Sequence, residues 1–213
     1  MTKNLIIAID GPSASGKGTL AKRLARHFNL PHLDTGSIYR AIAMRVIKQG
    51  IDPYNFEEKI LELVFNILPS ELENPELSSE EVGATASIIA KNKKLRLAIF
   101  DFQINFIENG KKNFGGAVLD GRDTTTVICP NANFKFYIDG DVEIRAKRRF
   151  DQLKQQGKSV TYDEILTQLK TRDDNDKNRV QSPLLIAQEA IIIDNGNSTI
   201  DESLAKMLNF INS

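Results

Sequence analysis

The sequence predicts an α/β fold in which helices pack on a parallel β-sheet, and three observations lead to this prediction. Short apolar runs rich in β-branched and aromatic residues recur along the chain. Longer stretches with helical spacing of apolar residues separate them. Three of the short runs end in aspartate. Strands buried on both faces of a parallel sheet have this composition, and the carboxyl ends of such strands are where open α/β sheets bind ligands.

Five segments are expected to form the strands. They are residues 5–9, 31–34, 117–120, 134–139 and 190–194, of which the segment 31–34 has the weakest pattern.

Helices are expected between these strands, and their ends are marked by residues that start or stop helices. The expected helices are residues 17–26, 37–48, 56–68, 93–108 and 161–170. Gly50 and Gly110 follow two of them and are typical of helix termination. Thr161 and Glu164 form a capping box at the start of the last one. The acidic stretch 68–81 has the most loop-like composition.

The composition is that of a soluble globular chain with one core. The 213 residues are 41% apolar, and 28 basic residues balance 28 acidic ones. This balance argues against a non-specific nucleic-acid or membrane binder. The first apolar run is too short for a signal peptide or a membrane span. A single cysteine, Cys129, excludes an intramolecular disulfide framework and is expected to be a small buried residue, so we expect a cytoplasmic protein.

The two histidines offer no catalytic pattern. His27 and His32 flank the end of the first expected helix, without the spacing of metal ligands or of a catalytic triad. Both are expected at the surface. A reaction at this chain therefore needs chemistry other than that of histidine or cysteine.

The stretch between the first strand and the first helix has the pattern of a phosphate-binding loop. Glycines allow the backbone to curl so that successive N–H groups point at phosphate oxygens, and the helix N-terminus and Lys17 add positive charge. The usual position of a Mg²⁺-binding hydroxyl carries Gly18, and the hydroxyl follows at Thr19. The residues expected to bind ATP are Gly11, Pro12, Ser13, Ala14, Ser15, Gly16, Lys17, Gly18 and Thr19.

The loop narrows the class of nucleotide-binding protein. A GTPase needs an Asn-Lys-x-Asp base reader, which the sequence lacks. The Gly-Lys-Gly-Thr ending is the variant seen in nucleoside monophosphate kinases. Thr19 is then a candidate for contact with Mg²⁺, directly or through water. Asp10, Asp34 and Asp120 are candidates for holding the water shell of the metal, and the sequence does not choose among them.

Arginines occur in four places that a kinase for a phosphorylated substrate could use. Such an enzyme holds two highly charged groups in line, so arginines from several segments must converge. The candidates are Arg40, Arg122, a basic run that begins at Arg145, and the mixed-charge segment 172–179. That segment combines both signs of charge and is interpreted as a mobile piece after the helix 161–170.

Taken together, these motifs resemble bacterial cytidylate (CMP/dCMP) kinases along nearly the whole chain. The matching stretches are GPSASGKGT, DTGSIYRA, ASIIAKNKKLR, LDGRDTTTVICPNA, FYIDGDVEIRAKRR, RDDNDKNRVQSPL and AIIIDN. The resemblance implies a three-layer P-loop kinase fold with a five-stranded parallel sheet. It also implies one kinase domain over residues 1–213, with a core of about 1–36, 111–144 and 180–213, a monophosphate-binding insert of about 37–110 and a lid of about 145–179.

The resemblance also implies roles for individual residues. The expected CMP-binding residues are Thr35, Tyr39, Arg40, Ser87, Arg96, Arg122, Asp123, Arg172, Asp176 and Arg179. The expected catalytic residues are Lys17, Arg145, Arg149, Arg172 and Arg179. Among the CMP-binding residues, Arg40 and Arg122 would neutralise the phosphate.

The chemistry of cytosine agrees with the roles expected of two of these residues. An aspartate at position 123 can accept a hydrogen bond from the amino group of cytosine, and Arg96 can donate to its acceptors. Uracil reverses this pattern. Leaving such groups unpaired costs about 1–3 kcal/mol each, so discrimination against UMP is expected.

The chain departs from the family pattern in three places. Thr125 stands where relatives have glycine, so a close backbone approach there would have to differ. Ile104 replaces an arginine that often follows Gln103. The insert is short, with only the stretch 68–81 where relatives carry a small antiparallel sheet.

The sequence therefore predicts a monomeric cytoplasmic kinase that uses ATP and Mg²⁺ to phosphorylate CMP and dCMP, without nucleic-acid or membrane partners. Two alternatives remain open at this point. One is another P-loop small-molecule kinase, of the UMP, AMP or shikimate type. The other is a non-catalytic nucleotide-sensing or RNA-associated protein that has kept the loop.

Overall fold

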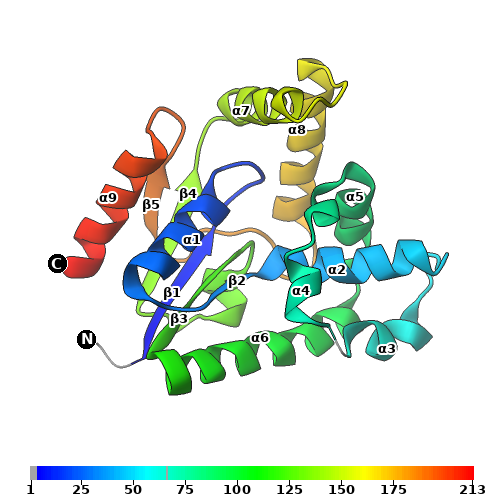
Figure 1. Ribbon diagram of the computed structural model, residues 1–213, viewed down its shortest axis with the longest axis horizontal. Helices are drawn as coiled ribbons and strands as arrows, with labels where there is room; N and C mark the ends of the chain where they lie inside the picture. The colour runs from blue at the N-terminus through cyan, green and yellow to red at the C-terminus, as the bar shows by residue number, and fades with distance from the viewer. Residues whose placement is uncertain (1–3, 66) are drawn as a thin grey trace. The chain divides into compact units, whose positions relative to one another are not determined.

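The computed structural model describes residues 4–65 and 67–213 (Figure 1). The chain divides into two compact units. The first, called the sheet unit below, is the part up to Leu33 together with Gly110–Ser213, and the second, the helical unit, is Asp34–Asn109.

The sheet has five strands in the order β2-β3-β1-β4-β5. They are β1 (Leu5–Asp10), β2 (His32–Asp34), β3 (Gly116–Gly121), β4 (Phe134–Asp139) and β5 (Ile191–Asp194). β1 pairs in parallel with both β3 and β4, and β4 pairs in parallel with β5. The predicted α/β fold with a five-stranded parallel sheet is confirmed. Because the chain moves to opposite sides of β1, the carboxyl ends of β1 and β3 flank the point where a sheet of this kind binds its ligands.

One apolar core joins the sheet to two helices. α1 (Lys17–Phe28) and α9 (Ile200–Asn212) pack on each other and on the sheet, as Figure 1 shows. Leu20 and Leu24 of α1 and Met207 of α9 are fully buried against Ile7 and Phe136. Burying such side chains supplies roughly 1.5–3 kcal/mol each, so the start of α1, directly after β1, is firmly anchored.

A second, smaller core lies between α7 (Val142–Gln155) and α8 (Tyr162–Asn178), which pack on each other and cross at a steep angle in Figure 1. The capping box of Thr161 and Glu164 is present at the start of α8. The helix does not end near residue 170 as predicted. It continues to Asn178, so most of the mixed-charge segment 172–179 belongs to the same helix.

The helical unit is built from short elements around α2 (Thr35–Lys48). They are η1 (Glu57–Lys59), α3 (Ile60–Val64), α4 (Pro69–Leu72), η2 (Pro75–Ser78), α5 (Glu80–Ile89) and most of α6 (Lys93–Phe114). α5 packs directly on α2.

The predicted helix 56–68 is wrong in its length, and a single arginine explains where it stops. α3 ends at Val64, because Arg45 of α2 donates to the backbone oxygens of Leu63 and Phe65 at 2.9 and 3.2 Å. The same guanidinium forms a bidentate ion pair with the carboxylate of Glu71. Residue 66, inside the predicted helix, lies outside the described residues.

The prediction that a helix stops before Gly110 is also wrong, because α6 continues to Phe114. Gly110 serves a different purpose there. A Cβ atom at this position would lie 2.6 Å from the backbone oxygen of Gly116. Only glycine lets the helix approach the start of β3 this closely. Along the described residues, no helix is both long and apolar enough to span a membrane.

We therefore expect Gly110→Ala to destabilise the fold, although Gly→Ala inside a helix ordinarily stabilises by about 1 kcal/mol. The new methyl group would overlap a backbone atom, and overpacking of this kind costs about 1–3 kcal/mol. Urea unfolding monitored by circular dichroism measures the change. Lys112→Ala, at an exposed position of the same helix, is the control and should shift the free energy of unfolding by less than about 0.5 kcal/mol. A Gly110→Ala variant as stable as the parent would contradict the close approach.

Candidate functional site

The loop between β1 and α1 is tightly curled, and two of its glycines are required for this. Gly16 caps α1 with φ of 88°, in the left-handed region. A Cβ atom at Gly11 would lie 2.2 Å from the backbone oxygen of Ile138 on β4. Both residues were predicted to let the backbone curl, and the structure gives each a specific reason to be glycine.

The carbonyl oxygens of the loop are held by donors from distant parts of the chain. Ser13 O accepts from Arg145 Nη1 at 2.8 Å, and Ser15 O accepts from Asn195 Nδ2 at 2.7 Å. Asn195 is fixed in turn by Ser203 of α9, whose hydroxyl donates to its Oδ1 at 2.7 Å. Lys17 Nζ lies 3.4 Å from the oxygen of Pro12. Because these carbonyl oxygens are bonded elsewhere, an anion at the loop would be bound by backbone N–H groups and by the N-terminus of α1.

A cleft of about 530 Å³ lies beside this loop in the sheet unit. Gly16 and Thr19 form one side of it, Arg149 of α7 lies on another, and Asn195 and Ile200 complete the lining. Thr19 is exposed and the Ser15 hydroxyl is buried without a hydrogen-bond partner. A buried hydroxyl of this kind is suited to a ligand oxygen.

Arg145 occupies a different place from the one that sequence reasoning gave it. It was expected to stabilise the transferring phosphoryl group. Its guanidinium is buried instead and bonds to Gly140 O, to Ser13 O and to the carboxylate of Asp173, the last at 2.6 Å. Asp173 also accepts from Ser13 N at 3.4 Å. The Arg145–Asp173 pair thus connects α7 and α8 to the phosphate loop, a role of Asp173 that was not predicted.

Four of the residues expected to bind CMP come together beside Ser13. Arg122, which follows β3, donates to Asp176 Oδ2 at 2.7 Å and to the Ser13 hydroxyl at 2.8 Å. Arg179 lies 3.9 Å from both Asp123 and Asp176. These residues come from the loop after β3 and the end of α8, more than 50 positions apart.

The carboxylate of Asp176 sits within this group of cations. Burial pushes its pKa upward, but the guanidinium groups of Arg122, Arg172 and Arg179 outweigh that effect and hold the pKa of Asp176 below its ordinary value. Arg172 therefore lies close enough to Asp176 to belong to the same group. The cluster combines both signs of charge within the sheet unit.

Asp10, one of the three aspartates considered for the metal, faces inward. It is fully buried and accepts from the N–H groups of Thr124 and Thr125 at 2.9 and 2.7 Å and from the Thr125 hydroxyl at 2.6 Å. Burial raises the pKa of this carboxyl, although these bonds act in the opposite direction. Asp10 thus holds the turn that carries Asp123. The same contact explains how threonine can replace glycine at position 125. The Thr125 hydroxyl bonds to Asp10, and the φ angle of Thr125 is not positive, so glycine is not required.

Near that turn, Cys129 is buried, as the sequence predicted. Burial raises the pKa of its thiol to about 12, so the group is inert near neutral pH.

Asp120, at the carboxyl end of β3, has a partner that was not anticipated. His32 Nε2 on β2 lies 2.7 Å from Asp120 Oδ1, with both side chains largely buried. The prediction that His32 lies at the surface without a specific role is wrong, whereas His27 is exposed in the last turn of α1 as expected. The missed signal is a hydrogen bond between residues 88 positions apart.

The helical unit carries the remaining residues expected to bind CMP. Asp34 caps α2 by accepting from Gly36 N, and its other oxygen pairs with Arg40 Nη2 at 2.5 Å. Arg96 of α6 lies over the ring of Tyr39, 5.7 Å from its centre. Thr35 is buried in the first turn of α2 and the Ser87 hydroxyl donates to Gly83 O within α5.

Comparison with known proteins gives a consistent result. The family model described as "Cytidylate kinase" matches residues 7–213. A cytidylate kinase of Rhodospirillum rubrum is 40% identical over 207 residues, covering 97% of each chain. Those of Bradyrhizobium sp. and Bartonella tribocorum are each 42% identical and cover 97% and 98% of this chain and 95% of their own.

Solved structures support the fold alone. A shikimate kinase from Bacteroides thetaiotaomicron has a TM-score of 0.51 at 13% identity, covering 98% of this chain and 99% of its own. A sugar kinase from Janibacter sp. has a TM-score of 0.52 at 11% identity, covering 98% of this chain and 95% of its own.

Arg145→Met is expected to destabilise the protein rather than only to slow a reaction. It leaves the buried carboxylate of Asp173 without its partner, which costs about 3–5 kcal/mol. The double variant Arg145→Met/Asp173→Leu should recover part of this loss, because both charges are then removed while the bonds to Ser13 and Gly140 stay lost. Chemical denaturation of the three proteins measures the effect. Arg149→Met on the same helix, at a partly exposed position, is the control, and an equal loss there would contradict a special role for the buried pair.

The lowered pKa of Asp176 predicts a pH dependence of stability. In the unfolded chain the carboxyl titrates near 3.8, and in the folded protein it titrates below that value. Folding therefore favours the ionised form of Asp176. The resulting stabilisation is fully present above the pKa of the unfolded chain and is lost as the pH falls through the pKa of the folded protein. The stability difference between the parent and Asp176→Asn should be constant above about pH 5 and should shrink below it. Unfolding measured without nucleotide from pH 3 to pH 7 tests this, and a constant difference throughout would contradict it.

Proposed function

The chain belongs to the cytidylate kinase family, and we propose that it transfers the terminal phosphoryl group of ATP to CMP and dCMP. The observation that carries this proposal is the group of Arg122, Asp123, Asp176 and Arg179 assembled next to Ser13 of the phosphate loop. A donor phosphate on the loop and an acceptor phosphate on Arg122 would be neighbours. We further propose that the protein acts as a monomer in the cytoplasm.

The loop and the adjacent cleft suit ATP. Phosphate oxygens would bind the N–H groups that the held carbonyls leave free, with Lys17 supplying a charge to the terminal phosphates. The cleft lined by Arg149, Asn195 and Ile200 offers polar and apolar surface for the adenosine part. Both features lie in the sheet unit.

The residues near the start of α1 also suit Mg²⁺. Thr19 and Asp120 provide oxygen donors, the kind that this ion prefers. Gly18 leaves room between them, since even a Cβ atom there would lie 3.7 Å from Asp120 Oδ2. Of the three candidate aspartates, we assign Asp120 to this ion, because its Oδ2 borders Gly18 in the first turn of α1, whereas Asp10 is buried against Thr124 and Thr125 and Asp34 caps α2. A bound Mg²⁺ would neutralise charge on the phosphates of ATP.

For the nucleoside monophosphate, we assign Arg122 and Arg40 to the phosphate and Asp176 and Arg172 to the ribose. Asp123 would accept from the amino group of cytosine, and Ser87 and Arg96 of the helical unit would contact the same base. Thr35 and Tyr39 would complete the site. A two-sign cluster suits a ligand that presents phosphate, hydroxyl and base groups together.

Catalysis would depend on charge and position. Lys17, Arg149, Arg172 and Arg179 would stabilise the charge on the transferring group and exclude water. We assign Arg145 the task of holding the loop and not of touching that group. The acceptor is already a phosphate oxyanion, so no general base is required, in keeping with the absence of a catalytic histidine pattern.

An assay of ADP release tests the proposal with CMP, dCMP, UMP, AMP, GMP and shikimate as acceptors. We expect turnover of CMP and dCMP and weak turnover of UMP. Asp123→Asn should lower kcat/KM for CMP by about 10–100-fold, since the loss of one buried base contact costs about 1–3 kcal/mol. The amide introduced by this substitution can donate to uracil, so kcat/KM for UMP should fall less or rise. The ratio of kcat/KM for CMP to that for UMP should therefore fall by more than kcat/KM for CMP itself.

Asp163→Asn, an exposed change near the start of α8, is the control and should leave both rates unchanged. Equal use of UMP and CMP by the parent would keep the kinase and refute the role of Asp123. Turnover of shikimate alone would refute the proposed substrate.

A further inference from the structure

His32 and Asp120 form a buried pair beside the phosphate loop. Nε2 of His32 on β2 lies 2.7 Å from Oδ1 of Asp120 on β3, and the exposed fractions of the two side chains are 13% and 3%. Since an ionised carboxylate only accepts hydrogen bonds, Nε2 carries the proton and donates it. One oxygen of Asp120 is thereby fixed.

The other oxygen of Asp120 faces the first turn of α1. A Cβ atom at Gly18 would lie 3.7 Å from Oδ2, so this oxygen borders the position where many phosphate loops place a hydroxyl. A carboxylate can rotate about its Cβ–Cγ bond when neither oxygen is held. The bond from His32 to Oδ1 restricts that rotation and directs Oδ2 toward Gly18.

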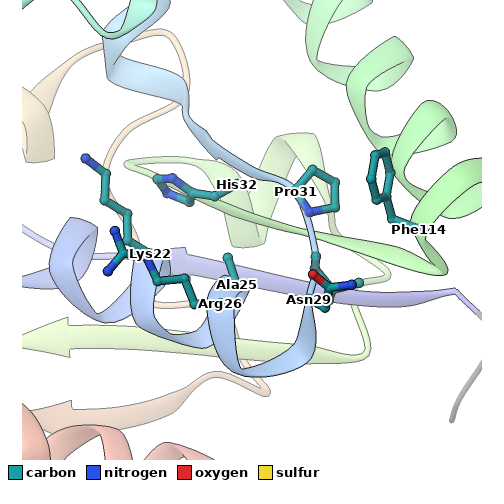
Figure 2. A pocket seen from close by; sticks show the side chains of 8 residues that line it. Lys22, Ala25, Arg26, Asn29, Pro31, His32 and Phe114 are labelled. Atoms are coloured by element: carbon teal, nitrogen blue, oxygen red, sulfur yellow. The ribbon is translucent and has the colours of Figure 1, made fainter.

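His32 is itself oriented by its surroundings. It lies at the start of the short edge strand β2, and Pro31 before it accepts from Val118 N at 2.9 Å. Its ring also borders a cavity of about 330 Å³ with Lys22 and Arg26 of α1 on one side and Phe114 on the other. Figure 2 shows the imidazole turned away from Pro31 and Phe114.

We propose that His32 is a positioning residue for nucleotide binding: by holding Oδ1 of Asp120, it orients Oδ2 toward the water shell of the Mg²⁺ that accompanies ATP. This inference rests on the proposed function, which assigns that carboxylate to the metal. Partners that hold metal-binding carboxylates contribute about 10–100-fold to metal affinity or activity. Because Asp120 would act on the metal through water, we expect the loss of His32 to weaken the contribution of Mg²⁺ to ATP binding by about tenfold, the lower end of that range.

The decisive experiment measures ATP binding by calorimetry with no acceptor present, once with Mg²⁺ and once with EDTA. The ratio of the two affinities reports the contribution of the metal without any turnover. His32→Leu removes the donor and should reduce this ratio about tenfold, while leaving the affinity in EDTA unchanged. His32→Gln places an amide N–H near the position of Nε2 and should restore most of the ratio. KM for ATP in Mg²⁺ should rise in His32→Leu more than kcat falls.

Two further variants make the outcomes separable. His27→Leu, at the exposed histidine five positions earlier, should match the parent. Asp120→Asn tests the assignment on which the inference rests: if it leaves the ratio unchanged, the metal role of Asp120 is refuted, and the inference with it. If Asp120→Asn lowers the ratio and His32→Leu does not, the proposed function stands and the role of His32 is refuted. An equal loss in His32→Leu and His32→Gln, accompanied by a lower unfolding midpoint, would also refute it, since it would mark His32 as an anchor of β2.

Discussion

The carbonyl oxygens of the loop after β1 are held by donors from across the sheet unit, and the site depends on this constraint. Arg145 holds the oxygen of Ser13, and Asn195 holds that of Ser15. A peptide unit with its oxygen fixed on one side presents its N–H on the other. With both oxygens fixed, the N–H groups of Ala14 and Gly16 in the same peptide units are oriented before any anion arrives, which is the condition for preorganised electrostatic binding. The anion does not have to supply the free energy of turning these groups.

Each holding residue also ties the loop to a different layer of the fold. Arg145 belongs to α7 and is fixed by Asp173 of α8, and Asn195 follows β5 and is fixed by Ser203 of α9. Both connections are buried, and a buried hydrogen bond that loses its partner costs about 1–3 kcal/mol. The loop is thus tied to the helices that surround it, despite having no regular structure of its own.

The strands and the loop were predictable because their signals are local. A run such as residues 5–9 must be buried on both faces, and the glycine spacing from Gly11 to Gly16 has few other uses. Helix ends were less predictable. Gly110 lies within α6 because of a contact with β3, and α3 stops because Arg45 binds its last carbonyls. Both depend on parts of the chain that periodicity does not reveal.

The same distinction applies to the site. The group of Arg122, Asp123 and Arg179 could be anticipated from the resemblance of its motifs to a family. The burial of Arg145 against Asp173, 28 positions away, and its bond to Ser13 O could not be read from the sequence. His32 carried no local pattern at all. Residues that act by holding another residue have no motif of their own, so the structure is needed to find them.

The arginines assigned to the substrate phosphate are not bare charges in this structure. Arg40 is paired with Asp34 and Arg122 with Asp176, so each cation already has a carboxylate beside it. A phosphate that binds there would share these guanidinium groups with carboxylates that already neutralise part of their charge. Counterion release, which makes binding to nucleic acids so sensitive to salt, comes from ions condensed on the polyanion and has little counterpart for a single phosphate. The affinity for a monophosphate should vary with ionic strength far less than the number of arginines suggests.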